Sequence, residues 1–570
     1  MPHPLNQPVA DLLAELGLLL ELSGGDPFRI RAYGSAARAI EVTDQSLAEL
    51  ATQGRLQSVK GIGPGVAGLI AAFLETGASP ELAALKASLP PGLIQMLRVQ
   101  GLGPKKVRAI HLQLGLDTLE GLEASCRDGR LAQLSGFGAK SQENILRALE
   151  QLKKYLGFFH LDTALLAART LCADLSPLTS RLELAGSLRR GLEVVEGVEL
   201  VACTPDPETL RQALCHHPLA RSAPAPDQIL LDGNLPVRLH LAEAPSWGVT
   251  LLHHTGNPAH LESLAARARE EGLRLVADGL YRGSEPIPCP DEETLYAALD
   301  LQYIPPELRE GRGEVEAAAA GTLPQLVQRS DLRGALHVHT TYSDGHHTLE
   351  EMAKAAMARG YSYLGICDHS RSAAYARGLQ IEDLRRQREE IDQLNEKLAP
   401  FRILAGIESD ILADGALDYE DAVLESLDLV VVSVHSRFNL EREEMTRRLC
   451  RALTHPCAAI LGHATGRLLL EREAYALDVE ALIETAAANQ VAIELNANPY
   501  RLDLDWRYLR QAADQGVPIA LNTDAHHLDQ FAYDELGAIL ARKAGLRPAE
   551  VLNTRSAGEL ISWLATRKRR

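Results

Sequence analysis

The chain has 570 residues, a length that suits about three to five domains. Apolar residues make up 46 % of the chain, which is enough for ordinary hydrophobic cores and excludes wholesale disorder. The formal net charge of −18 excludes a uniformly basic nucleic-acid-binding protein.

The eight cysteines form no Cys-x-x-Cys pair, which argues against a zinc ribbon and against a disulfide scaffold. No stretch approaches the roughly 18 consecutive apolar residues of a membrane span. The first residues also lack the basic start of a signal peptide. Together these features predict a cytoplasmic protein without a membrane partner.

Charge is distributed unevenly along the chain. Basic residues exceed acidic ones by one in residues 1–154, whereas acidic residues exceed basic ones by 11 in residues 155–332 and by 8 in residues 333–570. If the chain binds a polyanion, binding is therefore expected in residues 1–154.

The first segment contains three similar units, Val59–Ile70, Val99–Ile110 and Leu134–Leu146. Each reads apolar, any, Gly, apolar, Gly, and then continues as a helix, which predicts helix-hairpin-helix turns. The glycines permit positive φ, and the helix that follows presents bare N–H groups to a phosphate oxygen. A purely structural helix connection is the alternative. The candidate DNA-binding residues are Lys60, Gly61, Gly63, Gly101, Gly103, Lys105, Lys106, Gly136, Gly138 and Lys140.

The segment Phe28–Ile40, followed by these hairpins, resembles the N-terminal region of bacterial family X DNA polymerases. The resemblance implies a small helical domain over residues 1–80 that binds DNA ends and a fingers-like helical domain over residues 81–154. Several members carry a lyase lysine in a hairpin helix. The aligned positions here are Gly65 and Leu69, which supply no amine, so no lyase is predicted by that route.

Residues 185–203 resemble the family X palm signature, and residues 247–264 resemble the start of its thumb. The resemblance implies an α+β nucleotidyltransferase palm over residues 155–235 and a thumb over residues 236–315. It implies a triphosphate-binding role for Gly186, Ser187 and Arg190. At the thumb position where the family has a tyrosine-phenylalanine pair, this chain has His253 and His254.

The palm departs from the family at its three metal-binding aspartates. The aligned positions here are Gly197, Glu199 and Arg238, so one carboxylate of three remains. Hard Mg²⁺ needs carboxylate oxygens, and an arginine repels a divalent cation. Templated synthesis is therefore predicted to be weak or absent. The alternative is that rearranged carboxylates, with Glu196 shifted by one residue, still support synthesis with Mg²⁺ or Mn²⁺.

After an Ala-rich linker at 316–332, residues 333–570 alternate apolar strands with helical stretches. This alternation predicts a barrel-like α/β fold. The seven expected strands are 335–340, 363–370, 403–410, 429–436, 458–466, 491–499 and 518–526.

Nearly every expected strand ends in a residue type that binds metals. Because the carboxyl ends of barrel strands meet at one mouth, these side chains should converge. Imidazole mixed with carboxylate suits Zn²⁺, Mn²⁺ or Fe²⁺ better than Mg²⁺ alone. The nine candidate ligands are His337, His339, Asp344, His369, Glu408, His435, His463, Asp524 and His526.

The motifs around these residues resemble the polymerase and histidinol phosphatase (PHP) domain, a distorted seven-stranded barrel of the TIM type that follows the polymerase in bacterial family X enzymes. The resemblance implies three ions and a manganese-stimulated 3′–5′ exonuclease. One ion would be held by His337, His339, Glu408 and Asp524, a second by Glu408, His435 and His463, and a third by Asp344, His369 and His526. Arg467 is a candidate to orient the phosphate, and Asn496 and Asn522 are candidates to support the ligands.

The sequence thus predicts a DNA repair protein that hydrolyses phosphodiesters at 3′ ends, acting on gapped or 3′-ended primer-template DNA. A nucleoside triphosphate is a further possible ligand. One alternative is a working gap-filling polymerase with an accessory nuclease. The other is a DNA-binding module whose barrel hydrolyses a small phosphoester.

Overall fold

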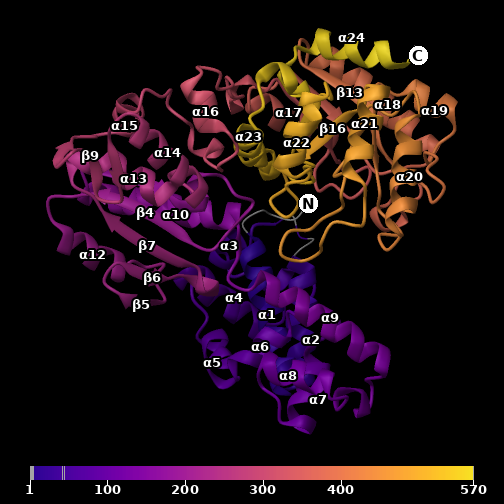
Figure 1. The fold of residues 1–570 in the computed structure, drawn as a ribbon. Helices are drawn as coiled ribbons and strands as arrows, with labels where there is room; N and C mark the ends of the chain where they lie inside the picture. The colour runs from indigo at the N-terminus through magenta and orange to yellow at the C-terminus, as the bar shows by residue number, and fades with distance from the viewer. Residues whose placement is uncertain (1–5, 41–42, 44, 569–570) are drawn as a thin grey trace. The chain divides into compact units, whose positions relative to one another are not determined.

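The computed structural model describes residues 6–40, 43 and 45–568, which form two units, Met1–Leu156 and Gly157–Arg570 (Figure 1). The first unit is helical. Its helices are α1 (Gln7–Ser23), α2 (Pro27–Ile40), α3 (Leu47–Thr52), α4 (Pro64–Thr76), α5 (Pro80–Ser88), α6 (Pro91–Met96), α7 (Pro104–Leu114), α8 (Leu119–Arg127) and α9 (Ala139–Tyr155).

Three helix-hairpin-helix turns precede α4, α7 and α9, as predicted, and they share one backbone geometry. The first glycine of each has a positive φ: 104° at Gly61, 88° at Gly101 and 87° at Gly136. The second glycine is the N-cap of the helix that follows. Glycine is needed at the first position because a side chain disfavours this backbone conformation.

Two apolar cores hold the first unit together. One is formed by helices α1 to α4, with Leu13, Leu16 and Ile70 fully buried. The other surrounds the second and third hairpins and includes Ile110 and Leu149. Each hairpin contributes its apolar residues to a core and leaves its glycines outside.

The second unit begins with a five-stranded sheet of order β2-β4-β7-β6-β5. Its elements are α10 (Leu161–Leu175), β2 (Arg181–Ala185), α11 (Gly186–Arg189), β4 (Val198–Cys203), α12 (Pro207–Cys215), β5 (Ser222–Ala225), β6 (Gln228–Leu230) and β7 (Pro236–Leu241). Strands β1 (Phe159–His160) and β3 (Val194–Val195) form a separate pair. The sheet continues through β7, so it extends past residue 235.

The two faces of this sheet are covered differently. Leu200 and Ala202 of β4 pack with α10 in the main core, whereas Val201 packs with Trp247 and Leu251 of α13 (Trp247–Thr255) on the opposite face. Glu199 shares the face of Val201, because side chains alternate along a strand. This face carries the polymerase-type positions.

The segment that follows has its own apolar core, centred on Tyr296 and Leu264. A small antiparallel sheet and four helices build it. They are α13, α14 (Pro258–Glu270), β8 (Arg274–Val276), β9 (Gly279–Arg282), β10 (Glu285–Ile287), α15 (Glu292–Ala298) and α16 (Glu314–Ala319).

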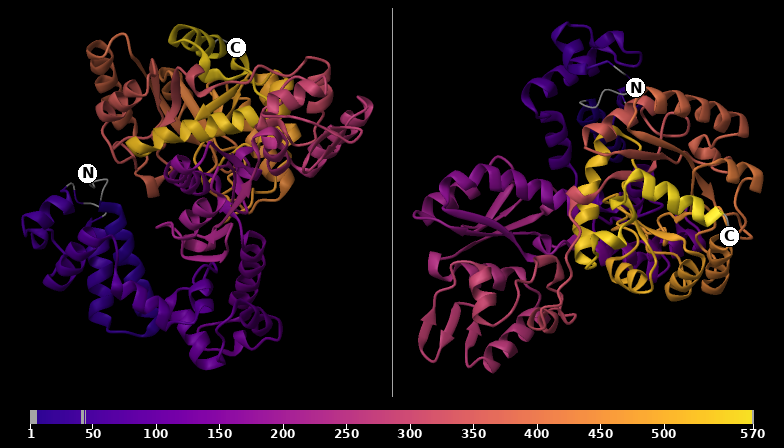
Figure 2. Two further views of the ribbon diagram at one scale, coloured as in Figure 1. Left: turned by 90° about the vertical axis from the view of Figure 1, so that its left-hand side faces the viewer. Right: turned by 90° about the horizontal axis from the view of Figure 1, so that it is seen from above.

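The last part is a seven-stranded parallel barrel in sequence order, as predicted (Figures 1 and 2). A parallel bridge between Val338 and Ala525 brings its first and last strands together. The strands are β11 (Gly334–Val338), β12 (Tyr363–Ile366), β13 (Arg402–Asp410), β14 (Leu429–Ser433), β15 (Ile460–Leu461), β16 (Ala492–Asn496) and β17 (Ile519–Asn522). Their buried, β-branched runs suit strands that are covered on both faces.

Helices surround the barrel, as the ribbon shows in orange and yellow (Figure 1). They are α17 (Leu349–Ala358), α18 (Ile381–Lys397), α19 (Asp421–Ser426), α20 (Arg442–Leu453), α21 (Val479–Asn489), α22 (Trp506–Asp514), α23 (Asp534–Lys543) and α24 (Ala557–Lys568). Among the helices of the described residues, none combines the length and apolar character that a membrane crossing requires.

Candidate metal centre

The nine candidate ligands lie at the carboxyl end of the barrel. His337 is in β11, with His339 just beyond it, and Glu408 is in β13. The others occupy the loops that follow strands β11, β12, β14, β15 and β17. Residues almost 200 positions apart therefore meet because parallel strands end at the same edge.

Glu408 is the centre of this group, which we call the ligand cluster. Its carboxylate lies 2.9 Å from His369 Nδ1, 3.0 Å from His463 Nε2 and 3.4 Å from His435 Nε2. It also lies 3.4 Å from His337 Nε2. A single buried carboxylate thus contacts imidazoles from four other strand ends.

Three overlapping sets of side chains in the cluster have ligand atoms close enough to share one ion. They are His339 with Asp344, His369 and His526; His337 with His339 and Asp524; and His369 with Glu408 and His435. His339 and His369 each belong to two sets, so the geometry resembles the expected division among three ions without reproducing it residue by residue.

Several polar atoms of the cluster are buried and lack a hydrogen-bond partner. They are His337 Nε2, both ring nitrogens of His339, His369 Nδ1, Glu408 Oε2 and His463 Nδ1. Buried polar atoms without partners are costly, and three of them, His337 Nε2, His339 Nε2 and His369 Nδ1, lie 3.4, 3.8 and 2.9 Å from the Glu408 carboxylate. The donor set of imidazole nitrogens and carboxylate oxygens therefore fits divalent cations.

The charges of the cluster are strongly coupled. Burial by itself lowers the pKa of His369, but the carboxylates of Glu408 and Asp344 outweigh it and raise the pKa to about 10. The same balance, with Glu408 and Asp410, raises the pKa of His435 to about 9. Burial next to His526 and His369 lowers the pKa of His339 to about 3. Carboxylate neighbours thus raise the pKa of His369 and His435, whereas burial and imidazole neighbours lower that of His339.

At the polymerase-type positions, the acidic side chain is paired with basic neighbours. Parallel pairing of β4 and β7 places Glu199 beside Arg238, and Arg238 Nη1 donates to Glu199 Oε1 at 2.9 Å. His240 Nε2 lies 2.5 Å from Glu199 Oε2 and stacks on His254. Burial opposes ionisation of Glu199, but these two partners prevail and lower its pKa. Both carboxylate oxygens are thus engaged by nitrogen donors.

The expected triphosphate-binding residues lie next to this site. Gly186 has φ 67°, and a Cβ there would lie 2.9 Å from Glu199 Cγ, so the turn closes directly over the carboxylate. Ser187 follows in α11. Arg190 is buried, donates from Nη1 to the Thr255 carbonyl at 2.6 Å, and pairs with Glu310 at 3.0 Å. Its guanidinium joins the sheet to the following segment in this structure.

Comparisons with known families match four parts of the chain. Residues 4–79 match a helix-hairpin-helix domain, residues 93–151 a SAM-like helix-hairpin-helix tandem, residues 250–310 the DNA polymerase beta thumb, and residues 335–498 the PHP domain. A relative named DNA polymerase/3'-5' exonuclease PolX, from Bacillus subtilis (strain 168), is 37 % identical over 563 residues, which cover 97 % of this chain and 98 % of the relative. The chain belongs to family X of the DNA polymerases.

Other relatives match the barrel alone. A probable phosphatase of Thermoanaerobacter sp. (strain X514) is 27 % identical over 247 residues, which are 41 % of this chain and 95 % of that protein. A probable phosphatase of Syntrophotalea carbinolica is 28 % identical over 230 residues, 38 % of this chain and 90 % of the relative. The barrel of this family X chain is thus similar to stand-alone proteins as well.

Three carboxylates that the motifs had not singled out support the ligand cluster. Glu494 in β16 accepts from His337 Nδ1 at 2.8 Å, and Asp410 in β13 lies 2.5 Å from His435 Nδ1. Asp368 accepts from Thr340 and Ser343 in the loop after β11. An acidic residue inside an otherwise apolar strand was the available signal for Glu494. The partners of His337 and His435 fix which ring nitrogen of each faces the ligand cluster.

The two candidate supporting asparagines contact Glu494, and one of them also contacts a candidate ligand. Asn496 Nδ2 donates to Asp524 Oδ2 at 3.1 Å and to Glu494, and Asn522 Nδ2 donates to Glu494 Oε1 at 2.9 Å. They therefore hold one candidate ligand directly and another through Glu494.

Two arginines lie in the loops beside the cluster: Arg467, which the motif favoured, and Arg501. Arg467 donates to the Arg501 and Leu502 carbonyls and pairs with Asp505 at 3.1 Å, so it braces a neighbouring loop. Arg501 Nε instead lies 3.9 Å from Asp524 Oδ2, with its side chain 21 % exposed. A loop without secondary structure places Arg501, which is why strand periodicity gave no signal for it.

The hairpin residues expected to hold DNA lie on an open surface. A Cβ added at Gly63, Gly101, Gly103, Gly136 or Gly138 would meet nothing within 4 Å. Lys60, Lys105 and Lys140 are exposed, whereas Lys106 Nζ donates to the Gly101 carbonyl at 3.0 Å and braces the second turn. The backbone of each turn is therefore accessible to a large ligand.

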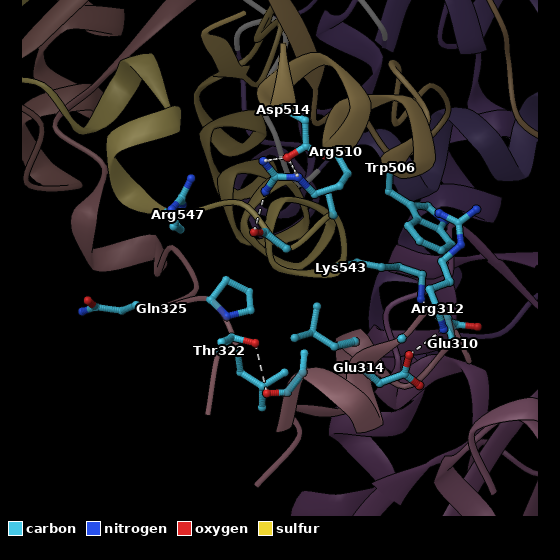
Figure 3. A pocket seen from close by; sticks show the side chains of 17 residues that line it. Glu310, Arg312, Glu314, Thr322, Gln325, Trp506, Arg510, Asp514, Lys543 and Arg547 are labelled. Carbon is cyan, nitrogen blue, oxygen red and sulfur yellow. Dashed lines mark hydrogen bonds and ion pairs between the residues drawn. The ribbon is translucent and has the colours of Figure 1, made fainter. Parts of the chain in front are cut away.

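A cavity of about 590 Å³ lies between the polymerase-type segment and the barrel (Figure 3). Two pairs of its charged side chains are in contact, Arg510 with Asp514 at 2.8 Å and Lys543 with Glu310 at 2.5 Å. None of the nine candidate ligands lines it. The ligand cluster, and not this cavity, holds the groups suited to phosphate chemistry.

Proposed function

We propose that the barrel of this chain hydrolyses the terminal phosphodiester at a DNA 3′ end. The observation that carries the proposal is the convergence of nine imidazoles and carboxylates, with Glu408 at their centre and several buried nitrogens left without partners. The PolX relative is named as a 3′–5′ exonuclease as well as a polymerase, which favours the same reaction. Water adds to phosphorus, the bond to the preceding 3′ oxygen breaks, and the products are a 5′-nucleotide and a new 3′ hydroxyl.

Three divalent cations, Mn²⁺ or Zn²⁺ with Fe²⁺ as a further possibility, fit the donor set. We assign His337, His339, Glu408 and Asp524 to one, Glu408, His435 and His463 to a second, and Asp344, His369 and His526 to the third. When bound, such cations lower the pKa of water and neutralise charge on the phosphate.

The chain's own residues prepare this site for the substrate. Glu494 keeps the Nδ1 proton on His337, so that Nε2 faces the cluster, and Asp410 does the same for His435. Asp344 and His526 are the most exposed of the nine, at 34 % and 26 %, so the substrate enters on their side. Arg501 lies beside Asp524, where its guanidinium can bind a phosphate oxygen.

We also propose that the polymerase core performs little or no synthesis. Nucleotidyl transfer of this class needs carboxylates that hold two metal ions. Here Glu199 is engaged by Arg238 and His240, and the neighbouring position Gly197 has no side chain to contribute. Gly197 is also tightly packed, since a Cβ there would lie 2.7 Å from the Pro236 carbonyl.

The helix-hairpin-helix turns would hold the DNA backbone through their open N–H groups and exposed lysines. The segments would then divide the work: residues 1–80 and 81–154 bind DNA, residues 155–315, whose sheet runs through β7, form a scaffold, and residues 333–570 cut the DNA strand. Gapped DNA and 3′-ended primer-template are the proposed substrates.

A second candidate is hydrolysis of a small phosphomonoester by the barrel, which the similarity to probable phosphatases favours. A shared metal centre would serve both reactions. The two reactions differ in whether the helix-hairpin-helix turns contribute, because a small ester has no DNA backbone for them to bind.

The decisive experiment uses a 5′-labelled primer-template with Mn²⁺, with and without nucleoside triphosphates. Wild-type protein should shorten the primer, and His339→Ala should abolish shortening. His216→Ala, an exposed histidine far from the barrel in sequence, is the matched control and should cut normally. Primer extension that persists in His339→Ala and disappears in Glu199→Gln would overturn the proposal for the polymerase core.

A small phosphomonoester, assayed in parallel, separates the second candidate. Rapid turnover of the ester by wild type, with an intact labelled strand, would refute the exonuclease. Shortening of the labelled strand together with weak ester turnover would support the exonuclease.

A further inference from the structure

An exposed aromatic side chain lies beside the ligand cluster. Tyr375 is 69 % exposed, although its ring centroid lies 6.0 Å from that of His369 and 6.3 Å from that of His435. Both histidines contact Glu408 at the centre of the cluster. A large aromatic surface is thus exposed to solvent beside two candidate ligands of the proposed reaction centre.

The two ends of the loop that carries Tyr375 are hydrogen-bonded to each other at His369, a candidate ligand. Leu379 N donates to the His369 carbonyl at 2.9 Å, and Gly378 N donates to the Ala373 carbonyl at 3.1 Å. A Cβ on Gly378 would lie 1.9 Å from the Ser370 carbonyl, so the two strands of the loop touch. The ring position is therefore tied to the position of His369.

A second set of contacts fixes the other side of this loop. Ser372 Oγ donates to Asp410 Oδ2 at 2.7 Å, and Ser372 N donates to Asp418 at 2.7 Å. Asp410 is the carboxylate that holds His435. The same buried acid therefore positions a candidate ligand and the loop of Tyr375, which gives a rigid, preorganised placement.

We propose that Tyr375 forms a nucleobase-binding subsite, on which the base of the 3′-terminal nucleotide stacks while its phosphate lies at the ligand cluster. Proteins bind single-stranded nucleic acid by stacking bases on aromatic rings, and this stacking tolerates every base. A stacked base would distinguish a DNA end from a small phosphoester, which has no base to offer. The proposal rests on the proposed function and names its substrate-recognition element.

The test compares two 5′-labelled strands that differ only at the last nucleotide. One ends in thymidine and the other in an abasic tetrahydrofuran nucleotide, joined by the same phosphodiester. Removal of this nucleotide is measured with Mn²⁺ over a range of DNA concentrations. Tyr375→Ala and Tyr375→Leu remove the ring, and Tyr375→Phe retains it without the hydroxyl.

Ring removal should raise KM for the thymidine-ended strand by roughly 5- to 100-fold, the loss expected for one base stack, and leave the abasic-ended strand within about twofold. Tyr375→Phe should behave as wild type. Tyr508→Ala, a half-exposed tyrosine on α22, is the matched control and should change neither strand. Metal content of each variant, measured on the purified protein, checks that the cluster is intact.

Two results would overturn the subsite. Either Tyr375→Ala slows both strands equally, which means a structural role, or it slows neither. A failure of the exonuclease itself is recognised separately, because wild-type protein would then shorten neither strand.

Discussion

Glu494 offers the sharpest test of how the barrel controls its candidate ligands. Its carboxylate is fully buried and accepts four hydrogen bonds. Oε1 accepts from His337 Nδ1 at 2.8 Å and from Asn522 Nδ2 at 2.9 Å. Oε2 accepts from the backbone N–H of His463 at 2.7 Å and from Asn496 Nδ2 at 3.1 Å. These four donors use all of the acceptor positions that a carboxylate has.

Glu494→Gln replaces one oxygen by an NH₂ group of almost the same size. Each oxygen of Glu494 faces two donors, and of the four only the His337 imidazole can change from donor to acceptor. The NH₂ should therefore take the Oε1 position, where it faces His337 Nδ1. The imidazole can accept there only by moving its proton to Nε2, the atom that faces Glu408. His337 would then be unable to bind a cation with Nε2.

Loss of a partner of this kind typically lowers metal affinity or activity by about 10- to 100-fold. We expect Glu494→Gln to weaken Mn²⁺ binding by that factor, measured by calorimetric titration of the metal-depleted protein. Strand shortening at limiting Mn²⁺ should fall in parallel and recover partly at high Mn²⁺. Glu471→Gln, a carboxylate exposed on a barrel loop, is the matched control. Unchanged Mn²⁺ affinity in Glu494→Gln, with the fold intact by circular dichroism, would refute the tautomer argument.

Three further predictions follow from other parts of the chain. Glu292 is buried against Arg309 and Arg189. Burial by itself raises the pKa of Glu292, but the two arginines prevail and lower it to about 2. The ionised carboxylate should therefore contribute about 3 kcal/mol to the free energy of unfolding above pH 4.5, and this contribution should disappear as the pH falls toward 2. Urea unfolding of wild type and Glu292→Gln should therefore differ near neutral pH and converge in acid; a constant difference would contradict this reasoning. Gly101→Ala should strain a turn with φ 88° by about 1–2 kcal/mol and weaken DNA binding, measured by fluorescence anisotropy, without changing Mn²⁺ binding by the barrel. Removal of bound metal by a chelator should lower Tm, because a ligand that binds only the folded state stabilises it, and Mn²⁺ should restore Tm in wild type but not in His339→Ala.

The sequence determined much of this architecture because its signals are local. Two glycines at fixed spacing before a helix can form few backbone structures, so all three hairpins were predictable. Apolar strands alternating with helices of suitable length fixed the parallel barrel, and the barrel in turn brought the nine candidate ligands to one mouth. The motif alignment likewise predicts that Gly197 and Arg238 stand at palm positions where the family has carboxylates.

Other features depended on contacts between residues that no local pattern connects. Arg467 donates to a loop carbonyl and Arg501 lies near Asp524, because loops that follow different strands decide where each guanidinium is placed. Glu494 supports His337 from β16, a strand that does not pair with β11, and Asp410 supports His435 from the neighbouring strand β13. Arg190 pairs with Glu310, which lies 120 residues away. Hydrogen bonds and charge pairs of this kind are decided by distance in space, so the chain specifies them only once it is folded.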